Sequence, residues 1–74
     1  MHTVSPVNED GQYLAKIFIA ARLESGLTQT ELARKGGMTQ TTIARLESGW
    51  DNPTWRTMCR VADALSKRIV LVDK

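Results

Sequence analysis

The chain of 74 residues is long enough for one domain, with little room for both a scaffold and an enclosed catalytic pocket. It contains no apolar run near the roughly 20 residues that a membrane-spanning helix needs. Residues 1–11 have neither Lys or Arg nor an apolar core, so they do not resemble a signal peptide. The single cysteine cannot form an internal disulfide, which fits the reducing interior of a cell. We therefore expect a cytoplasmic protein that does not associate with a membrane.

Charge is distributed unevenly along the chain. Residues 1–11 contain Glu9 and Asp10 and no Lys or Arg, so their formal charge is −2. Residues 12–74 contain all 10 basic residues and the other 6 of the 8 acidic ones, a charge of +4 that leaves the net charge at +2. This balance weakly indicates an anionic partner. Because residues 1–11 lack periodicity and contain Pro6, we predict a mobile arm; the alternatives are a short strand or an arm that binds a partner.

A first helix is predicted over residues 13–25. Its apolar residues recur at i, i+3, i+4 and i+7 and therefore share one face: Leu14, Ile17, Phe18 and Ala21. Gly26 follows, at the position where a left-handed residue commonly ends a helix.

Two shorter helices are predicted next. Thr28 and Glu31 have the spacing of a capping box, which indicates a second helix that begins after Thr28. The glycine pair at 36–37 ends this helix and permits a sharp turn. A third helix is predicted over 39–48, with Met38 filling the turn between the two helices.

The last part of the chain changes from a helical to a strand pattern. A fourth helix is predicted from residues 53–54 onward, with an apolar face made of Trp55, Met58, Val61, Ala62 and Leu65. The following β-branched run is typical of a short strand: Ile69, Val70, Leu71 and Val72. A single strand has no partner in an otherwise helical chain, so it pairs either with the N-terminal arm or with another subunit.

The second and third helices, joined by a glycine turn within residues 28–48, have the arrangement of a helix-turn-helix. In this motif the third helix projects its N-terminal half into a DNA major groove about 12 Å wide. The predicted exposed face of that helix carries hydrogen-bonding side chains that suit base edges: Gln40, Thr41, Thr42 and Arg45. Gln29 begins the second helix, where backbone N–H groups favour a phosphate. The alternative for the polar face is a solvated surface.

No enzymatic constellation is present in the sequence. It has no Cys/His dyad and no paired carboxylates on one helix face, and the glycines at 36–37 lack the lysine and the spacing of a phosphate-binding loop. His2 has no companion residues with metal-ligand spacing. We therefore predict neither an enzyme nor a metal or cofactor site.

Three stretches of sequence together resemble the Cro/C1-type (XRE) helix-turn-helix family, which includes phage repressors: GLTQTELA at 26–33, MTQTTIARLESG at 38–49 and NPT at 52–54. The resemblance runs from about Leu14 to Leu65. Within the family, the spacing of these matching residues and the basic-then-apolar segment at 67–72 resemble HigA-like antitoxins. The resemblance implies an all-α, lambda-repressor-like bundle of four to five short helices over 12–66. It also implies a C-terminal strand at about 68–72, within a dimerisation segment 67–74 that pairs across a dimer.

The same resemblance implies roles for individual residues. Gln40 and Thr41 correspond to the main base-reading positions, with Thr42 and Arg45 in support. Contacts to the DNA backbone are expected from residues at the ends of the two helices and in the following loop: Gln29, Thr39, Ser48, Trp50 and Asn52. Arg22 and Glu47 correspond to an ion pair between the first and third helices. Gly36 stands where the family usually has leucine, so a core contact is expected to be lost there.

A single recognition helix reads about four base pairs, too few for selectivity in a genome. A two-fold dimer reads two half-sites about 34 Å apart, so we expect a homodimer on a palindromic operator. The sequence thus favours a sequence-specific repressor, in particular an autoregulating HigA-like antitoxin that would also bind a cognate toxin. The alternatives are a phage or restriction-modification control regulator, and a protein-interaction module of the same fold that does not read DNA. Asp51 and the modest net charge favour the last alternative.

Overall fold

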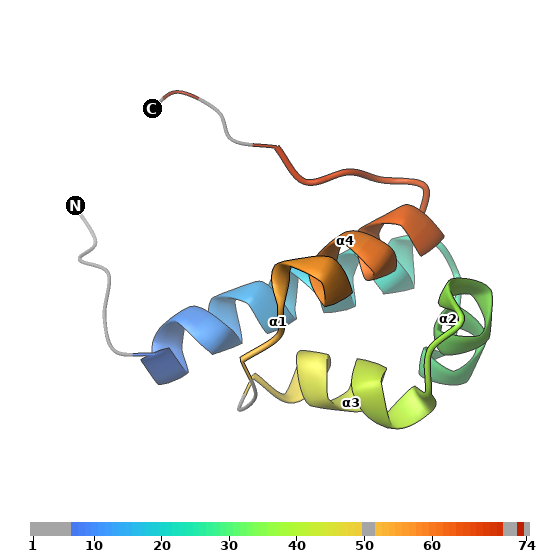
Figure 1. Cartoon of the computed structure of the whole chain (residues 1–74), viewed down its shortest axis with the longest axis horizontal. Helices are drawn as coiled ribbons and strands as arrows, with labels where there is room; N and C mark the ends of the chain where they lie inside the picture. Colours follow the sequence, from blue (N-terminus) through green and yellow to red (C-terminus); the bar gives the residue numbers. More distant parts are fainter. Residues whose placement is uncertain (1–6, 50–51, 71–72, 74) are drawn as a thin grey trace.

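The computed structural model describes residues 7–49, 52–70 and 73, with side chains from residue 12 onward. In these residues four helices follow one another and no strand is formed: α1 (Val7–Glu24), α2 (Gln29–Gly36), α3 (Gln40–Ser48) and α4 (Trp55–Ala64). Helix α3 packs against α1 and α2, and α4 packs against α2 (Figure 1). The predicted all-α architecture is therefore confirmed.

Helix α1 begins at Val7, six residues before the predicted start, so residues 7–11 are helical and the expected arm is shorter than predicted. The prediction relied on apolar periodicity, which the polar first turn of α1 lacks. Residues 1–6 of the predicted arm lie outside the described residues.

The capping box of α2 is formed as predicted. The Thr28 hydroxyl accepts a hydrogen bond from the backbone N–H of Glu31 at 3.0 Å, and the Glu31 carboxylate accepts one from the backbone N–H of Thr28 at 2.8 Å. At the other end, Gly37 has a φ of 67°, a left-handed conformation that favours glycine. Thr39 caps α3 only two residues later. The capping residues Gly37 and Thr39 therefore fix where α2 ends and where α3 begins.

The core brings together residues from all four helices. Leu32, Ile43 and Val61 are fully buried, one each from α2, α3 and α4. The other buried members of the cluster are one residue from each helix and the residue that caps the end of α4: Phe18, Ala33, Leu46, Ala64 and Leu65. Because a chain of this length buries only about 60% of its unfolded surface, the core is thin and few contacts are redundant.

Met38 packs against this core from the turn between α2 and α3, as predicted. A Cβ atom added to Gly36 would collide with the terminal methyl group of Met38. The Met38 side chain therefore occupies the space next to Gly36, and the core contact expected to be lost there is supplied from the turn. An unbranched, flexible thioether suits a gap of this shape.

Two apolar residues predicted for the core are exposed instead. Ile17 is 46% exposed and Trp55 is 62% exposed, so both predictions are wrong for the single chain. On α1 the small residue Ala15 faces the core beside Phe18. Trp55 is the first residue of α4, whose buried residues lie in its second half: Val61, Ala62 and Ala64. Both predictions took apolar spacing as a sign of burial.

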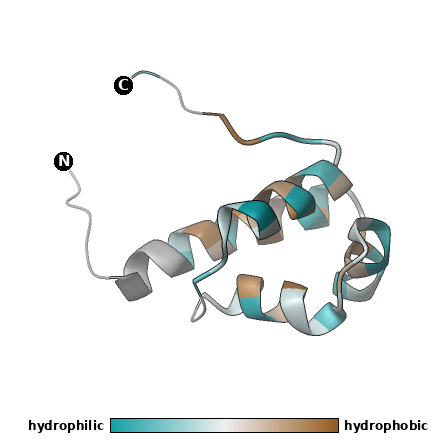
Figure 2. Cartoon of the chain, in the orientation of Figure 1, coloured by the Kyte–Doolittle hydropathy of each residue, from teal (hydrophilic) through white to brown (hydrophobic). Residues whose placement is uncertain are grey.

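The predicted C-terminal strand is not formed in the described residues 67–70, which belong to no helix or strand. A strand requires a hydrogen-bonding neighbour, and no described segment of this chain lies beside residues 67–70 as a strand. The segment changes from hydrophilic to hydrophobic along its length (Figure 2), and Val70 is 62% exposed. Leu71 and Val72 lie outside the described residues, so pairing with a second subunit stays a prediction.

The Glu31 carboxylate should make stability depend on pH. Its hydrogen bond from the Thr28 backbone lowers the pKa of Glu31 below the ordinary value of 4.5. The folded state thus binds this proton less readily than the unfolded state, so the contribution is present above about pH 4.5 and is lost as the pH falls through the lower, folded-state pKa. Urea denaturation of the protein and of Glu31→Gln should differ most above pH 5, with the gap narrowing toward pH 3. Glu24→Gln is the matched control, because the Glu24 carboxylate makes only an exposed ion pair with Lys67 at 3.5 Å and should give a much smaller pH-dependent gap. A gap for Glu31→Gln that does not vary with pH would contradict the assignment.

Candidate nucleic-acid interface

The outward face of α3 is mostly polar. At about 100° of rotation per residue, one side of the helix collects five residues from successive turns: Gln40, Thr41, Ala44, Arg45 and Ser48. Ile43 and Leu46 lie on the opposite side, in the core. Three of the four predicted base-reading residues therefore share one surface, and two of them, Gln40 and Thr41, are in its first turn.

Ala44 was not among the predicted site residues, although it lies one turn after Gln40 in the middle of this face. It is half-buried, and its side chain is a single methyl group, shorter than the side chains of Gln40 and Arg45. Small apolar groups at such positions contact the methyl group of thymine. Helical spacing from Gln40 could have identified it from the sequence.

Thr42, the fourth predicted base reader, lies about 200° around the helix from Gln40 and is half-buried. Its hydroxyl is 3.0 Å from the hydroxyl of Thr39, whose oxygen also accepts the backbone N–H of Thr42 at 3.2 Å. The structure thus places both threonines in the cap of α3. Either hydroxyl keeps hydrogen-bonding capacity beyond this pair.

The loop after α3 begins at Gly49, which is buried and has a φ of 77°. A Cβ at this position would lie 3.1 Å from the Cα of Gln12, so the end of α3 abuts α1 closely. Ser48 donates its hydroxyl to the carbonyl of Arg45 at 2.8 Å. Asn52 is exposed and borders a hollow of about 180 Å³ together with Thr42 and Arg45. Trp50 lies outside the described residues.

Four polar side chains form a continuous hydrogen-bonded chain across three helices, and we call it the relay: Arg22, Glu47, Gln29 and Gln40. Gln40 donates through Nε2 to Oε1 of Gln29 at 2.7 Å, and Gln29 donates through Nε2 to Oε1 of Glu47 at 2.9 Å. The structure therefore joins the main predicted base reader to the predicted phosphate contact. The sequence predicted the ion pair at one end but not that Glu47 also binds Gln29.

The ion pair at the inner end of the relay is formed as predicted. Arg22 donates to both carboxylate oxygens of Glu47, from Nε at 2.7 Å and from Nη2 at 2.9 Å, and from Nη1 to the carbonyl of Leu27 at 2.8 Å. The two side chains are 13% and 5% exposed. The hydrogen bonds to Glu47 raise the pKa of Arg22 above its usual value, although partial burial opposes this. The pair ties α1 to α3 and holds the turn after α1.

Other kinds of site find no support in the part of the chain that is described. No group of three or more His, Cys, Asp or Glu side chains is placed to hold a metal ion among these residues. No described helix is long and apolar enough to cross a membrane.

The helix-turn-helix family matches residues 19–72. The chain belongs to this Cro/C1-type family. Helix-turn-helix relatives include the antitoxin HipB of Escherichia coli K12, 37% identical over 60 residues that cover 81% of this chain and 68% of HipB. A second relative, an uncharacterised HTH-type transcriptional regulator of Haemophilus influenzae, is 34% identical over 59 residues, 80% of this chain and 60% of the regulator.

Solved structures also support membership of this family. A HipB–O4 20mer complex superposes with a TM-score of 0.77 at 30% identity and covers 99% of this chain and 97% of the HipB chain. The antitoxin in these comparisons is HipB; the predicted similarity to HigA-like antitoxins is not confirmed by them.

Two ion pairs among the described residues, Arg22–Glu47 and Lys67–Glu24, should differ greatly in their effect on stability. Arg22→Ala leaves the nearly buried Glu47 carboxylate without its cation and should lower the free energy of unfolding by about 3 kcal/mol. Lys67→Ala removes the same charge from an exposed pair with Glu24, 3.5 Å apart, and should cost less than about 1 kcal/mol. Thermal and urea denaturation of both variants measure the difference. Equal losses would show that the Arg22–Glu47 pair does not hold α1 to α3.

Proposed function

We propose that this chain is a sequence-specific DNA-binding transcriptional regulator, acting as a repressor in the cytoplasm. The observation that carries the proposal is the outward face of α3, where Gln40, Thr41 and Arg45 stand on one side of the second helix of a helix-turn-helix. Glutamine pairs with adenine through two hydrogen bonds, arginine with guanine, and a threonine methyl packs on thymine. Membership of a family whose relatives include HTH-type transcriptional regulators supports the same reading.

Contacts to the DNA backbone would come from residues beside this face. Gln29 begins α2, whose N-terminal N–H groups attract phosphate, and Thr39 is the N-cap of α3. Ser48, Trp50 and Asn52 follow at the other end of α3. With a net charge of only +2, non-specific attraction to DNA is weak. Selectivity therefore rests on the neutral hydrogen-bonding side chains, as in direct readout of base edges.

An antitoxin role is the finer proposal. Its support is the similarity to HipB and to a structure of a HipA–HipB–O2–O3 complex, which matches with a TM-score of 0.76 at 30% identity. We propose a HipB-like antitoxin that represses its own promoter and binds a cognate toxin. A phage or restriction-modification control regulator would share the DNA-reading face but lack a toxin. Co-purification with the product of the adjacent gene separates the two roles.

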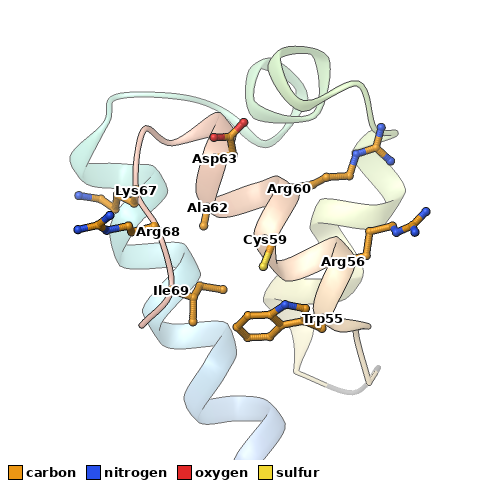
Figure 3. A pocket seen from close by; sticks show the side chains of 9 residues that line it. All are labelled: Trp55, Arg56, Cys59, Arg60, Ala62, Asp63, Lys67, Arg68 and Ile69. Atoms are coloured by element: carbon orange, nitrogen blue, oxygen red, sulfur yellow. The ribbon is translucent and has the colours of Figure 1, made fainter. Parts of the chain in front are cut away.

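The regulator is proposed to act as a homodimer through its C-terminal segment. Trp55 and Ile69 point toward one another across a groove of about 610 Å³ between α4 and residues 67–69 (Figure 3). Trp55 is 62% exposed and Val70 is 62% exposed, so a second copy has apolar surface to cover. Antiparallel pairing of Ile69–Val72 with its copy would give each segment the hydrogen-bonding neighbour that a strand requires.

Base reading by Gln40 can be tested on DNA selected from a random library. Gln40→Ala should weaken binding to the selected operator by about 1–3 kcal/mol and leave binding to random DNA nearly unchanged. For the unchanged protein, log K should fall with log[salt] by about 0.9 for each phosphate neutralised. Fluorescence anisotropy with both DNAs measures these quantities. Equal losses on both DNAs would show that Gln40 does not read a base.

Dimerisation can be tested by removing residues 68–74. The shortened protein should sediment as a monomer and bind the operator weakly and without selectivity, because one recognition helix reads too few base pairs. The double substitution Ile69→Asp and Val70→Asp keeps the chain length and should have the same effect. Sedimentation equilibrium and anisotropy check both. A shortened protein that remains a dimer would place the interface elsewhere.

A further inference from the structure

Glu47 makes one hydrogen bond in the relay that is not part of the ion pair, which is the bond it accepts from Gln29. Glu47 accepts three hydrogen bonds, two from Arg22 and one from Gln29, and its side chain is only 5% exposed. A carboxylate oxygen accepts and an amide nitrogen donates, so the Gln29 amide must turn its nitrogen toward Glu47. The reversed amide would place two acceptor oxygens 2.9 Å apart, which is repulsive.

The orientation of Gln29 then determines that of Gln40. With its nitrogen on Glu47, Gln29 presents its oxygen to Gln40, and Gln40 must donate through Nε2, as the 2.7 Å contact shows. Oε1 of Gln40 and the second hydrogen of its Nε2 remain for an external partner. An adjacent acceptor and donor match the N6 amino group and N7 of adenine in the major groove.

We infer that Glu47 is a positioning residue for base selectivity: through Gln29 it orients the Gln40 amide so that Gln40 selects adenine. This inference rests on the proposed DNA-reading function. Without an acceptor-only group at the inner end, both amides turn freely, and Gln40 loses its fixed rotamer as well as its direction. An ordered side chain loses less conformational freedom when it binds, so fixing Gln40 before binding adds to selectivity.

The test uses Glu47→Gln, which keeps the size of the side chain but replaces one acceptor with a donor, so that either orientation of Gln29 finds a partner. The matched control is Arg22→Lys, which breaks the bidentate ion pair and leaves the Glu47 carboxylate to accept from Gln29. Both variants weaken the same ion pair, and only the first removes the constraint on the amides. Side-chain amide NMR of Gln29 and Gln40 in the free protein reports the order of the relay without DNA.

Selection from a random library measures base preference for the protein and both variants. A bidentate contact discriminates by roughly five- to 150-fold, and we expect Glu47→Gln to lower the preference for adenine at the Gln40 position by at least about fivefold. Binding to random DNA should change by less than about threefold, since backbone contacts carry it. Arg22→Lys should keep the preference, and the Gln40 amide should be ordered in the unchanged protein and mobile only in Glu47→Gln.

Outcomes separate this inference from the proposed function. An adenine preference equal in the protein and in Glu47→Gln overturns the role of Glu47 and leaves the regulator intact. An equal loss in Arg22→Lys also overturns it, since the effect would then come from the ion pair. A mobile Gln40 amide in the unchanged protein overturns it even if Glu47→Gln does not fold. Absence of any base preference in the unchanged protein overturns the proposed function, and with it selectivity through Gln40.

Discussion

The ion pair between Arg22 and Glu47 is the constraint on which the placement of α3 depends. It spans α1 and α3, and Arg22 also binds the carbonyl of Leu27, in the turn that leads to α2. One guanidinium group thereby fixes three segments whose buried core is thin. Removing two charges from water is costly, and a pair of this kind adds little net stability compared with a well-packed apolar pair. Its value lies in geometry: the guanidinium fork and the carboxylate admit few arrangements.

The constraint set by the Glu47 carboxylate is transmitted outward because the links from Gln29 to Glu47 and from Gln40 to Gln29 are short, directional hydrogen bonds. From Glu47 to Gln40 the links are 2.9 Å and 2.7 Å, and they run from a nearly buried group to an exposed one. A side chain at a helix start in water normally samples several rotamers. Here the first residue of α3 is held from behind by a group in the interior. The Glu47 carboxylate thus takes part both in the ion pair with Arg22 and, through Gln29, in ordering the surface that we propose reads DNA.

Features set by neighbouring residues could be predicted from the sequence, while features set by contacts between distant residues could not. The capping box of Thr28 and Glu31 and the stop at Gly37 involve at most four consecutive residues, and both were predicted correctly. The start of α1 was wrong because a polar first turn carries no apolar period. The ion pair was anticipated only through family resemblance. The bond from Gln29 to Glu47 joins residues 18 apart, and no local pattern encodes it.

The exposure of Ile17, Trp55 and Val70 has the same explanation. Apolar spacing indicates which residues are stabilised by burial, but it does not indicate whether the same chain or a second molecule buries them. A chain this short leaves much of its apolar surface uncovered when it folds alone. If a second copy covers Trp55 and the C-terminal segment, association and selectivity are coupled, because the dimer that completes the apolar contacts also sets the spacing between two α3 helices. A substitution in the C-terminal segment would then alter DNA selectivity without contacting a base. The modest net charge of +2 strengthens this coupling, because the weak non-specific attraction to DNA would give a monomer only a low affinity for DNA.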